Sequence, residues 1–160
     1  MSTIHVVRGV ATAATAMASY DAALAAANVH NYNLVRVSSV IPAGATVTPV
    51  ETAPDLGPAG NRLTVVESRA TAAAGTAARV CAGVGWSTGP GPGLFYEASG
   101  DDPETVRETV ERGLAEGRRL REWTFDTTEV TVATADVPDD GDSYTTAVVL
   151  AAYGESEPIL

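Results

Sequence analysis

The sequence contains no lysine among its 160 residues. All ten basic residues are arginines, so the chain offers no ε-amino group for a lysine Schiff base such as the one that holds pyridoxal phosphate. Cysteine is almost as scarce. The single Cys81 cannot form an internal disulfide, and its small apolar neighbours predict a buried side chain and not a nucleophile. Any reactive group must therefore come from other residue types.

Long apolar runs and clusters of metal ligands are also missing. No run of about twenty apolar residues occurs, because polar residues interrupt the alanine-rich segment 11–29. The first residues lack the basic character of a signal peptide, so we expect a cytoplasmic protein. His5 and His30 stand without further ligands at metal-binding spacing, and we expect no metal site.

Positive charge is also in short supply. Twenty acidic residues oppose ten basic ones, which gives a formal net charge of −10 at pH 7. A surface of that sign repels nucleic acid phosphates and anionic lipids, so we expect neither nucleic acid nor a membrane as a partner. An acid-rich chain without lysine suits a halophilic cytoplasm, where counterions screen self-repulsion. GC-rich coding is the alternative explanation for the missing lysine.

The length and the hydrophobic content of 45% suit one domain, spanning residues 1–160. Patterning predicts helices at 15–28, with Met17, Tyr20 and Leu24 on one apolar face, and at 102–121. It predicts strands at 4–8, where Gly9 ends the strand, and at 32–37, 63–69, 79–86, 94–97, 124–136 and 144–153, with a short strand around 45–50. Two helices and about seven strands indicate an α+β layered domain.

Two glycine-containing segments need a separate interpretation. Residues 87–93, Ser-Thr-Gly-Pro-Gly-Pro-Gly, lack the lysine and the following helix of a phosphate-binding loop, so we interpret them as a turn. Gly113 and Gly117 lie next to the apolar stripe of the second predicted helix. We expect them to allow a close approach of that helix to a sheet, at some cost in helicity.

The stretch at residues 33–42 reads Asn-Leu-Val-Arg-Val-Ser-Ser-Val-Ile-Pro. Its front half alternates well enough to predict a short strand, and it ends in two adjacent hydroxyls, Ser38 and Ser39. Considered alone, such a pair is typical of a strand end and a turn, with the serines bonded to nearby backbone groups.

This stretch and its surroundings resemble the pyruvoyl-dependent arginine decarboxylase family. The matching segments are residues 20–24 (Tyr-Asp-Ala-Ala-Leu), residues 33–42, and residues 93–97 (Gly-Leu-Phe-Tyr-Glu) followed by Gly100, in the family's order and at closely similar spacings. The N-terminus is shorter than is usual in the family, and Ala43-Gly44 follow Pro42 where another proline or an acid is expected. The resemblance implies a four-layer αββα sandwich and a homotrimer with active sites between neighbours. Larger assemblies of trimers stay open.

The resemblance also implies that the chain cuts itself. The hydroxyl of Ser39 would attack the carbonyl of Ser38, and Asn33 would donate a hydrogen bond to the oxyanion that forms. The products would be a small chain, 1–38, and a large chain, 39–160, whose residue 39 has become a covalent pyruvoyl group. That group would supply the electron sink that a lysine-bound cofactor supplies elsewhere. Considered alone, Asn33 is an ordinary side chain bonded to backbone.

Two acidic residues complete the implied site. Glu97 would return a proton to the substrate's α-carbon, and Asp21, with the backbone around Leu24, would bind a guanidinium group. Considered alone, each acid is typical of an ordinary solvent-exposed side chain. The leading hypothesis is a decarboxylase that converts L-arginine to agmatine and CO2. The alternatives are a pyruvoyl decarboxylase for histidine or aspartate, and an uncleaved homologue without catalytic activity.

Overall fold

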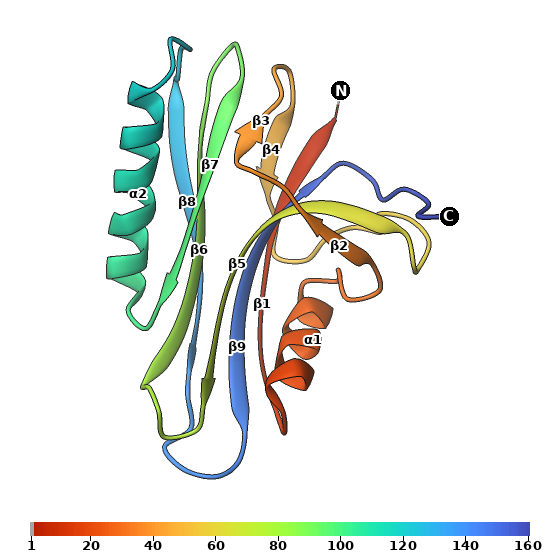
Figure 1. Cartoon of the computed structure of the whole chain (residues 1–160), viewed down its shortest axis with the longest axis vertical. Coiled ribbons are helices and arrows are strands. Elements are labelled where there is room, and N and C mark those ends of the chain that lie inside the picture. The colour runs from red at the N-terminus through yellow and green to blue at the C-terminus, as the bar shows by residue number, and fades with distance from the viewer. Residues whose placement is uncertain (1) are drawn as a thin grey trace.

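The computed structural model describes residues 2–160 and shows an α+β domain with two sheets and two helices (Figure 1). Helix α1 (Ala16–Ala26) packs on the five-stranded sheet, and α2 (Pro103–Arg119) packs on the four-stranded sheet. The strands are β1 (Thr3–Ala13), β2 (Asn33–Arg36), β3 (Val40–Ile41), β4 (Thr46–Pro49), β5 (Arg62–Ala73), β6 (Arg79–Thr88), β7 (Gly93–Gly100), β8 (Thr127–Asp136) and β9 (Tyr144–Tyr153). Within residues 2–160, neither helix is long and apolar enough to cross a membrane.

The chain passes between the two sheets several times. The five-stranded sheet has the order β2-β5-β9-β1-β4, and the four-stranded sheet has the order β3-β7-β6-β8. Strands β2 and β3 follow one another in sequence, yet β2 pairs with β5 and β3 pairs with β7. Residues 37–39, here called the crossing segment, therefore carry the chain from one sheet to the other. Ser38 and Ser39 lie in this segment.

Apolar side chains fill the space between the sheets and the space beneath each helix. The largest cluster lies between the sheets and includes Ile4, Trp86 and Phe95. A second lies beneath α1 around Leu24, and a third lies beneath α2. Cys81 is fully buried, as predicted. The layers are thus held together by burial of apolar surface on each inner face.

The contact between α1 and β1 overturns two predictions. Gly9 does not end the first strand, because β1 continues through it. A Cβ atom at Gly9 would lie 2.0 Å from the carbonyl oxygen of Ala23, so glycine lets the helix lie directly on the strand. The predicted apolar face is also wrong for Met17, which is 74% exposed. The helix instead buries Ser19, Ala23 and Leu24, since so close an approach favours small side chains.

The predictions for α2 are confirmed. Asp102 caps its start by accepting a hydrogen bond from the backbone N–H of Thr105 at 2.9 Å. Gly113 and Gly117 lie against β7, where a Cβ atom at Gly113 would come within 2.3 Å of the Tyr96 ring. The Tyr96 ring is therefore seated directly on the helix backbone at Gly113. The turn at residues 89–92 between β6 and β7 is also as predicted.

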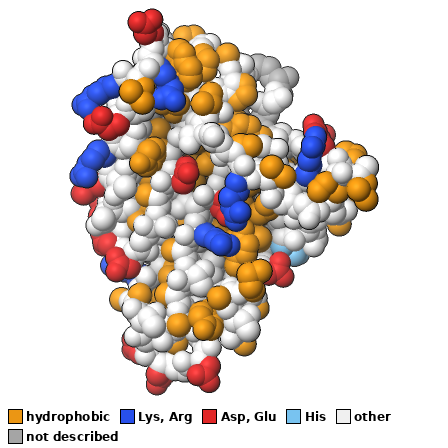
Figure 2. Space-filling model, viewed as in Figure 1, with side chains coloured by type: hydrophobic (Ala, Val, Ile, Leu, Met, Phe, Trp, Pro, Cys, Tyr) orange, Lys and Arg blue, Asp and Glu red, His pale blue; other side chains and the backbone are white. Residues whose placement is uncertain are grey.

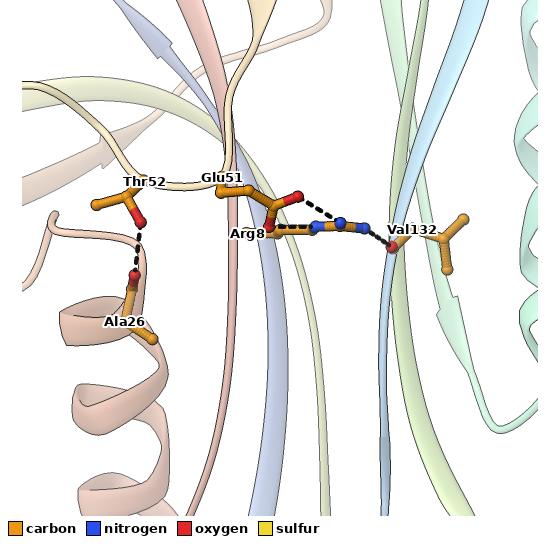
Figure 3. A network of polar contacts seen from close by, with 5 residues as sticks. All are labelled: Arg8, Ala26, Glu51, Thr52 and Val132. Carbon is orange, nitrogen blue, oxygen red and sulfur yellow. Dashed lines mark hydrogen bonds and ion pairs between the residues drawn. The ribbon is translucent and has the colours of Figure 1, made fainter.

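A polar contact joins the two sheets at Arg8 (Figure 3). The Arg8 guanidinium on β1 binds the Glu51 carboxylate through Nε at 2.9 Å and Nη2 at 2.5 Å, and this pairing lowers the pKa of Glu51. Its Nη1 donates to the carbonyl oxygen of Val132 on β8 at 3.0 Å. Thr52 donates to the carbonyl oxygen of Ala26 at 3.3 Å. The loop after β4 thus ties both sheets to the end of α1.

Candidate active site

The crossing segment is the short link between two paired strands. On one side, the N–H of Val37 donates to the carbonyl oxygen of Val65 on β5 at 3.0 Å. On the other side, the N–H of Phe95 on β7 donates to the carbonyl oxygen of Ser39 at 2.7 Å, next to the β3–β7 pairing. Ser38 is exposed and Ser39 is half-buried. A break between them would leave each new end held by a different sheet.

A cavity of about 430 Å³ opens beside Ser39, and we call it the serine cavity. Its walls come from β7 and α2, with the Tyr96 ring and Leu94 on one side and Arg112 and Arg121 on the other. Tyr96, which lines the cavity, and Val37 and Val40, which flank the serine pair, are 40 to 43% exposed, and so is Val35 on β2. Figure 2 shows charged side chains gathered along α2 and hydrophobic ones across the upper middle of the same face.

Glu97 on β7 and Tyr153 on β9 belong to different sheets, and both side chains lie on the faces that the two sheets turn toward each other. Glu97 follows Phe95 by two residues on β7, so both side chains are on the face toward the other sheet. Burial raises the pKa of Glu97 although part of the residue is exposed. Burial, with a smaller effect of the Glu97 charge, raises the pKa of Tyr153 to about 12. The site thus combines a carboxyl group that holds its proton more firmly than usual with a phenol that stays neutral.

Tyr153 also contacts the segment that follows the serines. Its hydroxyl donates to the carbonyl oxygen of Val40 at 2.9 Å, and its ring packs edge-on against Phe95 with centroids 5.9 Å apart. Because Val40 follows Ser39 directly, this bond and the one from Phe95 fix two successive carbonyl groups after the Ser38–Ser39 bond.

The predicted substrate residues gather in a second cavity of about 570 Å³, here called the Asp21 cavity. Asp21 and Leu24 on α1 and Asn33 on β2 line it together, with Tyr20 and Arg36 beside them. Asp21 is exposed and makes no ion pair with any residue in the described range 2–160. Its carboxylate is therefore available to an external cation.

One protomer does not unite the two sets of residues. Asn33 donates to the carbonyl oxygen of Gly60 at 2.8 Å, at the opposite end of β2 from the serines. Five residues of extended chain, each rising about 3.3 Å, place Asn33 roughly 16 Å from Ser38. The serine cavity and the Asp21 cavity share no lining residue. The structure thus brings Asp21, Leu24 and Asn33 together, whereas Ser39 borders the other cavity, whose lining does not include Glu97.

Sequence reasoning missed Tyr153 and the whole α2 side of the serine cavity. Tyr153 ends a long predicted strand and belongs to no motif, so only the pairing of β9 in space reveals its contact with Val40. The short strand β3 was also missed, because two residues carry no detectable alternation. No group of three or more side chains suited to a metal ion occurs among residues 2–160.

The protein is thus an α+β domain of two sheets, with a serine pair where the chain crosses from one sheet to the other. A family model described as pyruvoyl-dependent arginine decarboxylase matches residues 3–158. Two Halobacterium salinarum proteins of that name are 54% identical to this chain over 162 residues, covering 99% of it and 98% of their own length. A Pyrococcus furiosus protein of the same name is 32% identical, covering 87% of this chain and 88% of its own. The chain belongs to the pyruvoyl-dependent arginine decarboxylase family.

The residues at the crossing segment fit the covalent pyruvoyl group that membership of this family implies. Ser39 borders a cavity, so a group formed at this position would face open space. The carbonyl groups of Ser39 and Val40 are each held by a hydrogen bond from the protein. The chain has no lysine that could hold a different carbonyl cofactor. Ser39 is thus the residue that would carry the group.

Proposed function

We propose that this protein is a self-processing enzyme that decarboxylates L-arginine to agmatine and CO2. The observation that carries the proposal is the position of Ser38 and Ser39 in the short link between β2 and β3, with Ser39 beside a cavity. The names and 54% identity of the Halobacterium salinarum relatives support arginine as the substrate. The exposed Asp21 carboxylate, which suits a guanidinium group, also supports it.

Cleavage begins when the Ser39 hydroxyl oxygen attacks the carbonyl carbon of Ser38 and converts the peptide bond into an ester. Elimination then breaks the Cβ–O bond of residue 39 and releases the carboxylate of Ser38. Hydrolysis of the dehydroalanine left at position 39 releases ammonia and leaves the pyruvoyl group. The products are the chains 1–38 and 39–160. They stay associated because β1, in the small chain, pairs with both β4 and β9 of the large chain.

A pyruvoyl group at position 39 would supply a ketone for the substrate amine and a sink for the electrons released as CO2 leaves. Glu97 holds a proton in a partly buried position and delivers it to the α-carbon, for which its raised pKa is suited. Asp21 binds the guanidinium group in a two-point contact, and Leu24 packs beneath it at the border of the Asp21 cavity.

The complete site is shared between protomers of a homotrimer with the αββα sandwich of this family. Asn33 and Asp21 of one protomer approach the serine cavity of its neighbour, which brings the Asn33 amide within reach of the oxyanion. The separate cavities in one protomer support this arrangement. So do the exposed side chains of Val35, Val37, Val40 and Tyr96, which an interface would cover. The substrate is a small molecule, and the composition favours a cytoplasmic, high-salt setting.

Substrate assays test this function directly. Purified protein is offered arginine, histidine and aspartate separately, and the CO2 released is measured for each. The proposal expects CO2 and agmatine from arginine alone, and no turnover by the Ser39→Ala variant. Preferential turnover of histidine or aspartate would replace the proposed substrate. An uncut protein that turns over none of the three would favour the uncleaved, non-catalytic homologue.

A further inference from the structure

Glu67 on β5 is a buried carboxylate that the proposed chemistry does not use. Its side chain is only 2% exposed and faces α1. Arg36 binds one of its oxygens, Oε1, through Nε at 2.8 Å and Nη2 at 2.6 Å. The hydroxyl of Tyr20 donates to the other oxygen, Oε2, at 2.5 Å. Each oxygen of one buried group therefore receives donors from a different element.

The two partners of Glu67 belong to the two halves of the site. Arg36 is the last residue of β2 and precedes Ser38 by two positions. Tyr20 lies on α1 next to Asp21, and burial together with the Glu67 bond raises its pKa to about 12, so the phenol keeps its proton. The guanidinium of Arg69 lies 4.5 Å from the centre of the Tyr20 ring and restrains the ring further.

We propose that Glu67 is a positioning residue that sets both the crossing segment and the substrate-binding helix. Through Arg36 it fixes the end of β2, and so the direction from which Ser38 enters the crossing segment. Through Tyr20 it fixes the turn of α1 that carries Asp21. A buried carboxylate suits this task because the loss of either donor, Arg36 or Tyr20, would leave a buried charge incompletely hydrogen-bonded, which costs free energy. The folded state therefore favours a single arrangement of both donors. The inference rests on the proposed self-cleavage and arginine decarboxylation.

The two contacts predict separable effects. Arg36→Gln should slow self-cleavage by roughly 10- to 100-fold, the scale expected when reacting groups are displaced by about 1 Å. Tyr20→Phe should cleave at the wild-type rate, yet raise the KM for arginine by about tenfold with little change in kcat, since it loosens Asp21 and leaves the reacting groups in place. Glu67→Gln should show both effects.

A double variant tests whether Arg36 acts through Glu67. Cleavage of the unprocessed chain is followed by intact mass for wild type, Arg36→Gln, Glu67→Gln and the two combined. Because the substitutions remove one contact, the double variant should cleave no more slowly than the slower single variant. Multiplied effects would overturn the proposal, and so would wild-type cleavage by Glu67→Gln. A wild-type protein that stays uncleaved would instead defeat the proposed function itself.

Two control variants separate positioning from general stability. Val7 lies on β1, two strands away from β5, in the apolar cluster beneath α1. Val7→Ala opens a gap in that cluster and should lower Tm without slowing cleavage. Glu157→Gln removes an exposed ion pair with Arg62, at the start of β5, and should change neither. If Glu67→Gln does not fold, Arg36→Gln alone decides, because Arg36 is 55% exposed and tolerates change. Wild-type cleavage by folded Arg36→Gln would then overturn the proposal.

Discussion

The hydroxyl of Tyr153 donates a hydrogen bond to the carbonyl oxygen of Val40 at 2.9 Å, joining the end of β9 to the residue that follows Ser39. In the intact chain, Val40 is also held through its covalent connection to Ser38. After cleavage that connection is lost, and the first residues of the large chain depend on β3, Phe95 and Tyr153. This bond should therefore matter more to the processed protein than to its precursor.

Tyr153→Phe should lower the Tm of the processed protein and leave the Ser39→Ala precursor nearly unchanged. Loss of one hydrogen bond costs about 1 kcal/mol, which corresponds to roughly 2 to 4 °C in a chain of this size. Differential scanning calorimetry of Tyr153→Phe with and without Ser39→Ala measures both shifts. Equal shifts in the two backgrounds would show that Tyr153 supports the fold in general and not the new chain end.

Asp21→Asn should weaken the use of arginine while self-cleavage persists. Removal of one partner of a buried charge pair costs about 2 to 5 kcal/mol, and the substitution keeps the size of the side chain. The specificity constant kcat/KM for arginine, measured on fully cleaved protein, reports the loss. A wild-type value would remove Asp21 from the substrate site.

Glu97→Gln should still cleave between Ser38 and Ser39, yet lose decarboxylation by about 10²- to 10⁴-fold, the usual contribution of a positioned general acid. Glutamine matches the size of the side chain but cannot give up a proton. Both rates are measured on the same variant. Parallel loss of cleavage and turnover would indicate that Glu97 supports the precursor's structure, and full turnover would pass the acid's role to another residue.

The raised pKa of Glu97 predicts a pH dependence of turnover. Because the acid form is the active one, kcat should fall as the pH rises through this elevated pKa. The stability of the fold should also fall as the pH rises. A carboxyl group with a raised pKa in the folded state contributes stability that is complete below its ordinary pKa and is lost as the pH rises through the raised value. A kcat that is flat across this range would contradict the assignment.

The sequence predicted the elements well and their relation in space poorly. Helices and long strands carry clear local patterns, so the α+β class and the strand that leads to the serine pair were predicted correctly. Gly9 looked like a strand end because the sequence alone does not distinguish a glycine that allows close helix contact from one that ends a strand. Met17 looked buried because spacing cannot reveal that small side chains face the sheet.

The long-range contacts of the site carry no local signal. Glu67 lies 31 residues from Arg36 and 47 from Tyr20, and Tyr153 lies 113 residues from Val40. Only the sheet order, which places β5 beside β2, brings Arg36 to Glu67. The separation of Asn33 from the serines likewise follows from the extended form of β2. Such relations depend on strand pairing, which local patterns along the sequence do not reveal.

Intact mass spectrometry of the purified protein shows directly whether the chain is cut between Ser38 and Ser39. Two masses are expected, one for residues 1–38 ending in a free carboxylate and one for residues 39–160 beginning with a pyruvoyl group. The larger fragment should resist Edman degradation because its first group is a ketone, and Ser39→Ala should give one uncut mass. A single uncut mass from wild-type protein that decarboxylates arginine would contradict the pyruvoyl mechanism.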